Sequence, residues 1–225
     1  MMKTNQDYKN AALAALKGNW TTAVLASVIL MVISTLLSLP STLLSLSLVD
    51  ASMAAAIQGV DMNTYNCVGF VLIMLIVCPL AVGAANAFRR LLVDGDGNVT
   101  SNMIDDTLTR FGHNFWGMLL MCIYVSLWSL LLVVPGIVKS FSYAMTPFIL
   151  KDYPELTAHQ AICLSNKMMK GHKWELFWFT MSFMGWAILG VITFGILNFW
   201  LTPYIYTALA AFYQDVKAEY IKKNA

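Results

Sequence analysis

Residues 94–98 (DGDGN) are the part of the sequence that most resembles a ligand motif. Oxygen-bearing side chains recur there at every second residue, as in the first half of an EF-hand calcium loop. Val99 stands where such a loop needs a glycine for its turn, and Asp105 stands where it needs a bidentate glutamate. We therefore interpret the stretch as a solvated turn rather than a calcium site.

Three polar residues, Asn19, His113 and His172, hold equivalent places in a motif that occurs three times. If the three copies pack around one axis, these residues converge at a cytoplasmic mouth, together with Glu175. Two histidines and an amide lack the third strong ligand of a zinc site, so we predict capping roles and no metal. A carboxylate at the start of a helix, as for Glu175, is favoured by the helix dipole.

The sequence indicates no enzyme and no cofactor. It contains neither G-x-S-x-G nor H-E-x-x-H, and we predict no catalytic residue. No Asp or Glu lies deep in an apolar stretch, which argues against coupled transport. Seven other residues could line a cavity or contact a ligand, although each can instead bond a neighbouring helix: Asn86, Lys139, Ser142, Tyr143, Asn198, Tyr204 and Tyr206. Lys139 can either snorkel to the outer headgroups or bind an anion.

The composition places these residues in a membrane protein. The chain is 59% apolar and 12% charged, whereas soluble domains are about 45–50% apolar and about 25% charged. A water-soluble fold of 225 residues could not bury that apolar surplus, so lipid must cover it. The four cysteines form no C-x-x-C pair, and we infer neither a disulfide nor a metal site from them.

Six apolar stretches are predicted to cross the membrane, since about 20 helical residues span the hydrocarbon core. The predicted crossings are 20–39, 67–88, 115–134, 137–150, 174–193 and 196–213. The fourth is short, at roughly 21 Å.

Lysine and arginine orient the six predicted crossings. With six crossings, every lysine and arginine except Lys139 falls on one side, which the positive-inside rule assigns to the cytoplasm. Both termini are then cytoplasmic.

Each odd-numbered crossing is predicted to follow a short amphipathic helix, a glycine and an aromatic residue. The helices are expected at 7–17, 102–111 and 157–170, and the glycines at Gly18, Gly112 and Gly171. Glycine suits the left-handed position after a helix. Thr157 and Gln160 match a capping box. These helices could lie in the lipid interface or serve as connectors under the bundle.

Basic residues at the inner ends of the helices are expected to contact inner-leaflet lipid. They are Arg89, Arg90, Lys167, Lys170 and Lys173. Membrane lipids are thus the expected partners, with a membrane-protein partner also possible and nucleic acid excluded.

Several short runs resemble a bacterial integral-membrane family catalogued as domain of unknown function nine hundred seventy-five. They are residues 167–173 (KMMKGHK), 183–186 (FMGW), 203–204 (PY) and 211–213 (AFY), with 135–136 (PG) and 143–145 (YAM) fitting the same pattern. That family is in turn similar to the membrane domain of some glycerophosphodiester phosphodiesterases. The resemblance implies a multi-helix inner-membrane protein and supplies no catalytic residues.

The predicted fold is therefore all-α: one membrane domain, 1–225, with six transmembrane helices as three hairpins. Its segments are a cytoplasmic helix (1–19), a first hairpin (20–88), a cytoplasmic loop and helix (89–113), a second hairpin (114–150), an interfacial helix (151–173), a third hairpin (174–213) and a tail (214–225). The expected function is non-enzymatic: binding lipid or another amphiphile, or organising a membrane partner. The alternatives are a small-solute permease or channel and, less favoured, a membrane enzyme.

Overall fold

The computed structural model describes residues 3–47 and 62–224, and this part of the chain contains helices and no strands. The helices are α1 (Asn5–Leu16), α2 (Trp20–Ser47), α4 (Met62–Val93), α5 (Val99–Leu108), α6 (Phe111–Leu131), α7 (Val133–Tyr143), α8 (Thr146–Asp152), α9 (Ala158–Met168), α10 (Lys173–Met181), α11 (Met184–Ile192) and α12 (Asn198–Asn224). The predicted all-α fold is confirmed.

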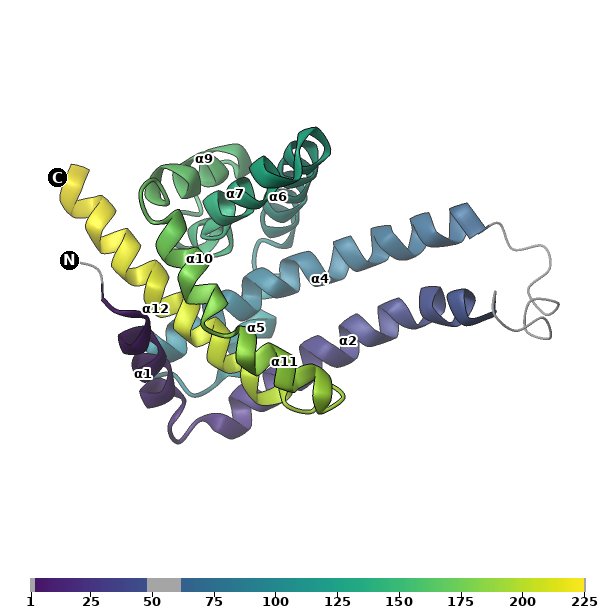
Figure 1. Cartoon of the computed structure of the whole chain (residues 1–225), viewed down its shortest axis with the longest axis horizontal. Coiled ribbons are helices and arrows are strands. Elements are labelled where there is room, and N and C mark those ends of the chain that lie inside the picture. The colour runs from purple at the N-terminus through teal and green to yellow at the C-terminus, as the bar shows by residue number, and fades with distance from the viewer. Residues whose placement is uncertain (1–2, 48–61, 225) are drawn as a thin grey trace.

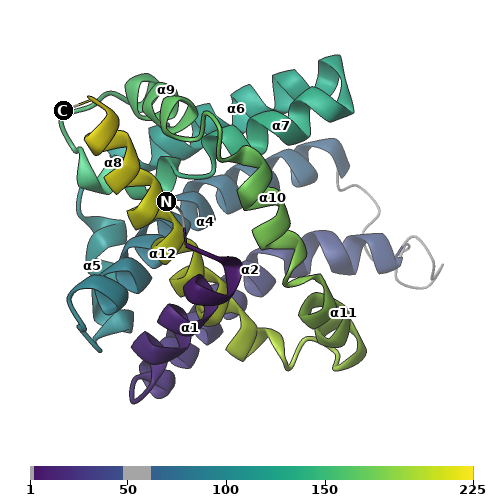
Figure 2. The same cartoon turned by 60° about the vertical axis from the view of Figure 1, so that its left-hand side comes forward.

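The two longest helices of the N-terminal half, α2 and α4, lie side by side and project from a body formed by the remaining helices (Figure 1). The first and last described residues lie on the opposite side of that body. Figure 2 shows α12 running through the body between α1 and the α8–α9 region. The inner parts of α2 and α4 are thereby held, whereas their far parts extend beyond the other helices.

Within residues 3–47 and 62–224, four helical segments are long and apolar enough to cross a membrane: Trp20–Leu37, Met74–Val93, Phe111–Leu131 and Lys173–Ile192. The chain is therefore a helical protein of membrane type, as its composition predicts. The predicted fourth crossing is instead divided into α7 and α8. The last predicted crossing continues without a break into the charged end of α12.

The glycines that precede the odd-numbered crossings differ in conformation. Gly18 and Gly171 have φ of 90° and 101°, so the predicted left-handed turn is confirmed at both. At the second copy the prediction was wrong: Gly112 lies inside α6, and Arg110 takes the left-handed conformation with φ 60°. Helix α6 thus begins earlier than the glycine suggests, because an arginine carries the chain reversal.

Helix α9 begins with the predicted capping box. Thr157 Oγ1 accepts from the Gln160 amide, and the Gln160 side chain accepts from the Thr157 amide at 2.8 Å. The apolar face that its spacing predicts, formed by Ala161, Ile162 and Met168, is buried. Ser165 Oγ on the same face donates to the Ser142 carbonyl at 2.9 Å. Helix α9 therefore packs on the bundle as a connector.

Replacing Thr157 with alanine should lower the free energy of unfolding by about 1 kcal/mol, because the Gln160 backbone amide in the first turn of α9 loses its side-chain acceptor. Thermal unfolding in detergent measures the effect. The matched control is Thr21→Ala on the exposed side of α2, which should change stability by less than about 0.5 kcal/mol. Equal effects would contradict the capping role.

Helix α5 differs from α9 because it leaves apolar side chains exposed. It was predicted at 102–111 and spans Val99–Leu108, and its apolar residues Ile104 and Leu108 are exposed. The face that it buries carries Asn102 and Asp106 together with the apolar residues Val99 and Met103. An exposed apolar face on a short helix suits contact with lipid rather than with water.

Aromatic side chains join the chain termini to the third hairpin. Tyr8 of α1 packs edge-on against Phe179 of α10 and Phe212 of α12, with ring centroids 5.9 and 5.5 Å apart. Phe148 of α8 stacks on Tyr213 of α12 at 4.9 Å. All five rings are almost fully buried, so α12 is the element around which the body packs.

Candidate functional site

A buried carboxylate at the end of α8 joins three parts of the chain. Asp152 lies 2.9 Å from Arg89 of α4 and 2.6 Å from Lys217 of α12, and only 5% of its side chain is exposed. Tyr213 of α12 donates a third bond, of 2.8 Å, to the same carboxylate. A buried charge is tolerated only when it is paired and hydrogen-bonded, and here the three charged members lie just after the ends of the three predicted hairpins.

A second buried carboxylate repeats the arrangement beside the first. Asp106 of α5 lies 3.0 Å from Arg90 of α4 and 2.7 Å from Lys151 of α8, with 3% of its side chain exposed. The two clusters hold four cations and two carboxylates, so they leave an excess of positive charge at this end of the bundle. We refer to the residues of both clusters as the ion-pair belt.

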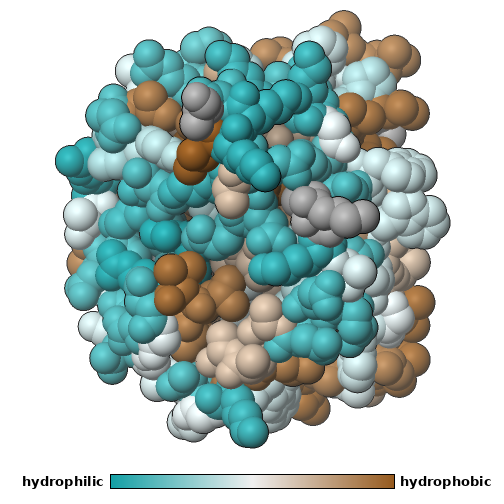
Figure 3. Space-filling view, turned by 90° about the vertical axis from the view of Figure 1, so that its left-hand side faces the viewer, coloured by the Kyte–Doolittle hydropathy of each residue, from teal (hydrophilic) through white to brown (hydrophobic). Residues whose placement is uncertain are grey.

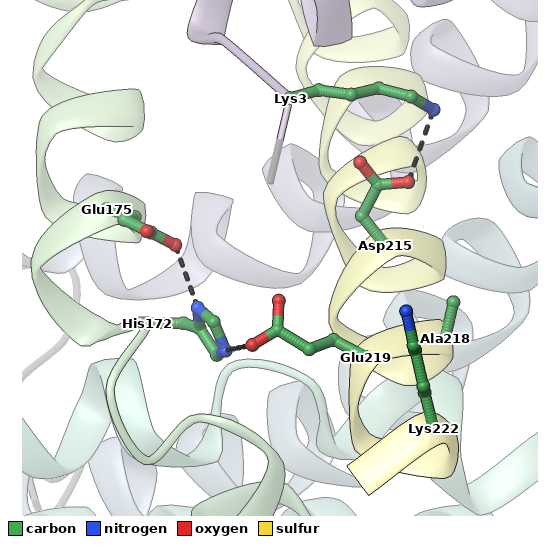
Figure 4. Close-up of a pocket in the computed structure, with 7 residues that line it drawn as sticks. All are labelled: Lys3, His172, Glu175, Asp215, Ala218, Glu219 and Lys222. Atoms are coloured by element: carbon green, nitrogen blue, oxygen red, sulfur yellow. Dashed lines mark hydrogen bonds and ion pairs between the residues drawn. The ribbon is translucent and has the colours of Figure 1, made fainter. Parts of the chain in front are cut away.

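A polar cleft opens beside the termini, between α12 and the turn that precedes α10 (Figure 4). His172 lies between two carboxylates there: its Nδ1 is 2.9 Å from Glu175 and its Nε2 is 3.5 Å from Glu219. Across the cleft, Lys3 pairs with Asp215 at 3.2 Å. The cleft has a volume of about 740 Å³ and lies on a face that is mostly hydrophilic (Figure 3).

A second groove, of about 320 Å³, shares His172 and Glu219 with this cleft. We call it the lysine groove; it is lined by Lys167, Met168, Lys170, His172, Glu219, Tyr220, Lys223 and Asn224. Among the described residues, none of its three lysines forms an ion pair, whereas Arg89, Arg90, Lys151 and Lys217 all do. The structure thus separates cations that hold the bundle together from cations left available on its surface.

The basic residues that were predicted to contact lipid fall on both sides of this division. Arg89 and Arg90 belong to the ion-pair belt. Lys167 and Lys170 are exposed on the lysine groove. Lys173 begins α10 outside it.

The residues predicted at the cytoplasmic mouth are held by different elements. His172 and Glu175 are paired in the polar cleft. His113 of α6 bonds the Leu150 backbone, and its Nε2 has no partner among the described residues. The Asn19 side chain donates to the Ala15 carbonyl at 3.4 Å and touches the loop at Gly97. Among the described residues, no three His, Cys, Asp or Glu side chains gather as a metal site.

The residues proposed for a cavity are distributed through the bundle. Asn86 is fully buried and donates to the carbonyls of Val82 and Pro147. Ser142 bonds the Val138 carbonyl of its own helix at 2.7 Å, and the adjacent Tyr143 is buried.

The other cavity candidates lie elsewhere. Tyr206 stacks on Phe88 at 5.7 Å, while Tyr204 and Asn198 line two separate apolar grooves. Lys139 lies 4.8 Å from the Trp128 ring centroid. Its charge is also near enough to Lys173 for the two to repel.

The acidic loop is bonded to the start of helix α5. Asp96 accepts from the Asn102 side chain at 2.7 Å and from the Asn98 amide at 3.0 Å, and these bonds hold the pKa of Asp96 below its usual value. Both carboxylate oxygens therefore serve the first turn of α5, which agrees with the interpretation of this loop as a turn.

Sequence reasoning missed Asp106 and Asp152, because both acids lie outside the predicted crossings, where a carboxylate is expected to face water. A signal was present in the pair Lys151-Asp152 directly after an apolar stretch. It also missed a contact between Cys78 of α4 and Cys122 of α6, whose thiols hydrogen-bond each other. Nothing in the spacing of the cysteines indicates this contact, since it depends on how α4 and α6 pack.

The chain was compared with known families, curated proteins and solved structures. Residues 130–220 match the family model described as "Protein of unknown function (DUF975)". No curated protein and no solved structure matches the chain. The further likeness to the membrane domain of some glycerophosphodiester phosphodiesterases stays a prediction. The matched segment runs from the end of α6 through most of α12 and includes Asp152, Lys217 and the lysine groove. Through residues 130–220, the chain is therefore similar to this DUF975 family, as its short sequence motifs predict.

Proposed function

We propose that this protein is a non-enzymatic membrane protein that binds anionic lipid headgroups through the lysine groove. The observation that carries the proposal is the division of its cations. Those buried in the bundle are matched by carboxylates, whereas Lys167, Lys170 and Lys223 line one groove without an ion-pair partner among the described residues. Lysines at the inner membrane surface attract anionic lipid by about 1 kcal/mol each.

The proposal includes all six predicted crossings. Four of them correspond to the segments that are long and apolar enough by themselves. The other two are formed by α7–α8 and by the first part of α12. Residues 176–214, which form most of the third hairpin, contain no charge. Both described ends of the chain lie on the hydrophilic face (Figure 3). We therefore propose that this face is cytoplasmic, following the positive-inside rule, and that the membrane is the bacterial inner membrane, which the family resemblance supports.

Aromatic side chains support this placement of the groove. Trp116 and Trp174, near the starts of α6 and α10, are 62% and 65% exposed. Tryptophan favours the headgroup level of a bilayer. Lys167 and Lys170 directly precede the turn that leads to Trp174, so a headgroup at that level lies within reach of their side chains.

Replacing Lys167 and Lys170 with glutamine should weaken the binding of phosphatidylglycerol by roughly tenfold or more, because two attractive charges are lost. Lipid retention by the purified protein, measured by native mass spectrometry against phosphatidylcholine, checks this. The control with equal loss of charge is Lys3→Gln with Lys17→Gln, which leaves the lysine groove intact.

If both double variants lose phosphatidylglycerol binding equally, the effect depends only on the net charge of the protein, and the proposal is overturned. Retention that does not depend on headgroup charge would also overturn it. Saturable flux of a small solute through reconstituted protein would favour the permease instead.

A further inference from the structure

Three sulfur atoms meet between α4 and α6, in a place that neither the ion-pair belt nor the lysine groove uses. Cys78 Sγ donates to Met74 Sδ at 3.5 Å on the same helix. The same thiol hydrogen-bonds the Cys122 thiol on the facing helix. Cys78 is buried, and its surroundings are apolar.

The surroundings of these atoms are also rich in sulfur. Both helices carry the sequence Met-x-x-x-Cys, at 74–78 and at 118–122, which places methionine and cysteine on one helical face. Met118 belongs to the same buried cluster as Cys78, and Met121 packs against that cluster. Thioether and thiolate sulfur are soft ligands, which select soft metal ions such as copper(I).

The depth of the three atoms can be estimated along both helices. Cys78 precedes Arg89 by 11 residues, and Cys122 follows Arg110 by 12, which corresponds to about 16–18 Å at about 1.5 Å per residue. Half of the hydrocarbon core is about 15 Å. If Arg89 and Arg110 mark the inner boundary, the sulfur atoms lie close to the middle of the membrane.

We infer that Met74, Cys78 and Cys122 form a binding site for a soft monovalent metal ion, copper(I). Binding replaces one thiol proton by the metal: the S–H bond of one cysteine breaks, a thiolate–copper bond forms, and the proton leaves to water. The site stays electrically neutral, as a low-dielectric environment requires. The other thiol and the thioether complete a three-sulfur set, and no oxidation or reduction takes place.

The geometry disfavours a divalent alternative. Zinc is almost always held by four ligands in a tetrahedral site, and no three His, Cys, Asp or Glu side chains gather among the described residues. Two-coordinate and three-coordinate sulfur sets instead suit a soft ion.

The test uses the full chain with Cys67 and Cys163 replaced by serine. Cys163 has to be removed because its sulfur lies 3.5 Å from His159 Nε2, which could hold copper independently. The purified protein competes for copper(I) with a chromogenic chelator in anaerobic, reducing buffer. We expect one copper per chain, at least a hundredfold weaker binding for Cys78→Ser and Cys122→Ser, and roughly tenfold weaker binding for Met74→Leu. The control Met184→Leu alters an exposed methionine of α11 and should leave copper binding unchanged.

A second measurement does not depend on the variants folding. X-ray absorption of copper bound to the protein that retains Met74, Cys78 and Cys122 should show only sulfur atoms as neighbours of the metal. Absence of binding, retention of binding by Cys78→Ser, or nitrogen and oxygen neighbours would each overturn the site. Isolation of the pair as a disulfide in reducing buffer would also overturn it.

Discussion

Replacing Asp152 with alanine is expected to lower the free energy of unfolding by about 3–5 kcal/mol. The substitution leaves Arg89 and Lys217 without their shared carboxylate in a site where Asp152 is 5% exposed, and it removes the acceptor of Tyr213. Leaving a buried cation unpaired costs more free energy than forming the ion pair gains. The loss of stability should therefore exceed the loss on breaking an ordinary surface ion pair. Denaturant or thermal unfolding in detergent measures it.

The matched control is Lys3→Ala, which removes the partner of Asp215. That lysine is 59% exposed, and an exposed ion pair contributes no more than about 1 kcal/mol. If the two variants lose similar stability, the ion-pair belt is not what holds α4, α8 and α12 together.

Replacing Gly83 with alanine should destabilise the protein by about 1–3 kcal/mol or more, because the added methyl group has no space. A Cβ at Gly83 would overlap Thr107 Oγ1 and the Met103 carbonyl oxygen, and it would lie 3.0 Å from the Thr107 amide nitrogen. Two of these three atoms are backbone atoms of α5, so the helix would have to move away from α4. The midpoint of unfolding and the helical signal report the change.

Gly185→Ala on α11 is the control for this substitution, since a Cβ there meets no atom within 4 Å. In that helix alanine should be neutral or stabilising by about 0.5–1 kcal/mol. A neutral Gly83→Ala variant would mean that α5 does not pack against α4 as described.

The sequence predicted the features that depend on neighbouring residues. The capping box at Thr157 and the left-handed glycines Gly18 and Gly171 are determined within a few residues of chain, and local patterns report such features well. The same reasoning failed at Gly112, because Arg110 makes the chain reversal there and an arginine gives no local signal for it.

Hydropathy could not predict how the second and third hairpins are interrupted. Regular α-helical hydrogen bonding is interrupted between α7 and α8 and again between α10 and α11, although both interruptions lie in apolar segments. Pro147 follows the first interruption and restricts the residue before it. No proline accompanies the second, so its position depends on packing that a hydropathy profile does not contain.

The candidate sites were least predictable where they join distant parts of the chain. Lys217 and Asp152 are separated by 65 positions, and Cys78 and Cys122 meet only because α4 packs on α6. From charge alone, Arg89 and Lys167 were both predicted to contact lipid. In the structure Arg89 is paired with Asp152, whereas Lys167 lies on the surface in the lysine groove. Buried partners, rather than residue type, make the difference.

The order of Arg89, Asp152, Tyr213 and Lys217 along the chain bears on how the molecule folds during synthesis. The ribosome produces Arg89 and Asp152 well before Tyr213 and Lys217. Until α12 emerges and docks, the Asp152 oxygen that Tyr213 and Lys217 contact has neither donor. Helix α12 therefore completes the ion-pair belt, and in a nascent chain that stops before α12 this oxygen of Asp152 lacks both of its donors.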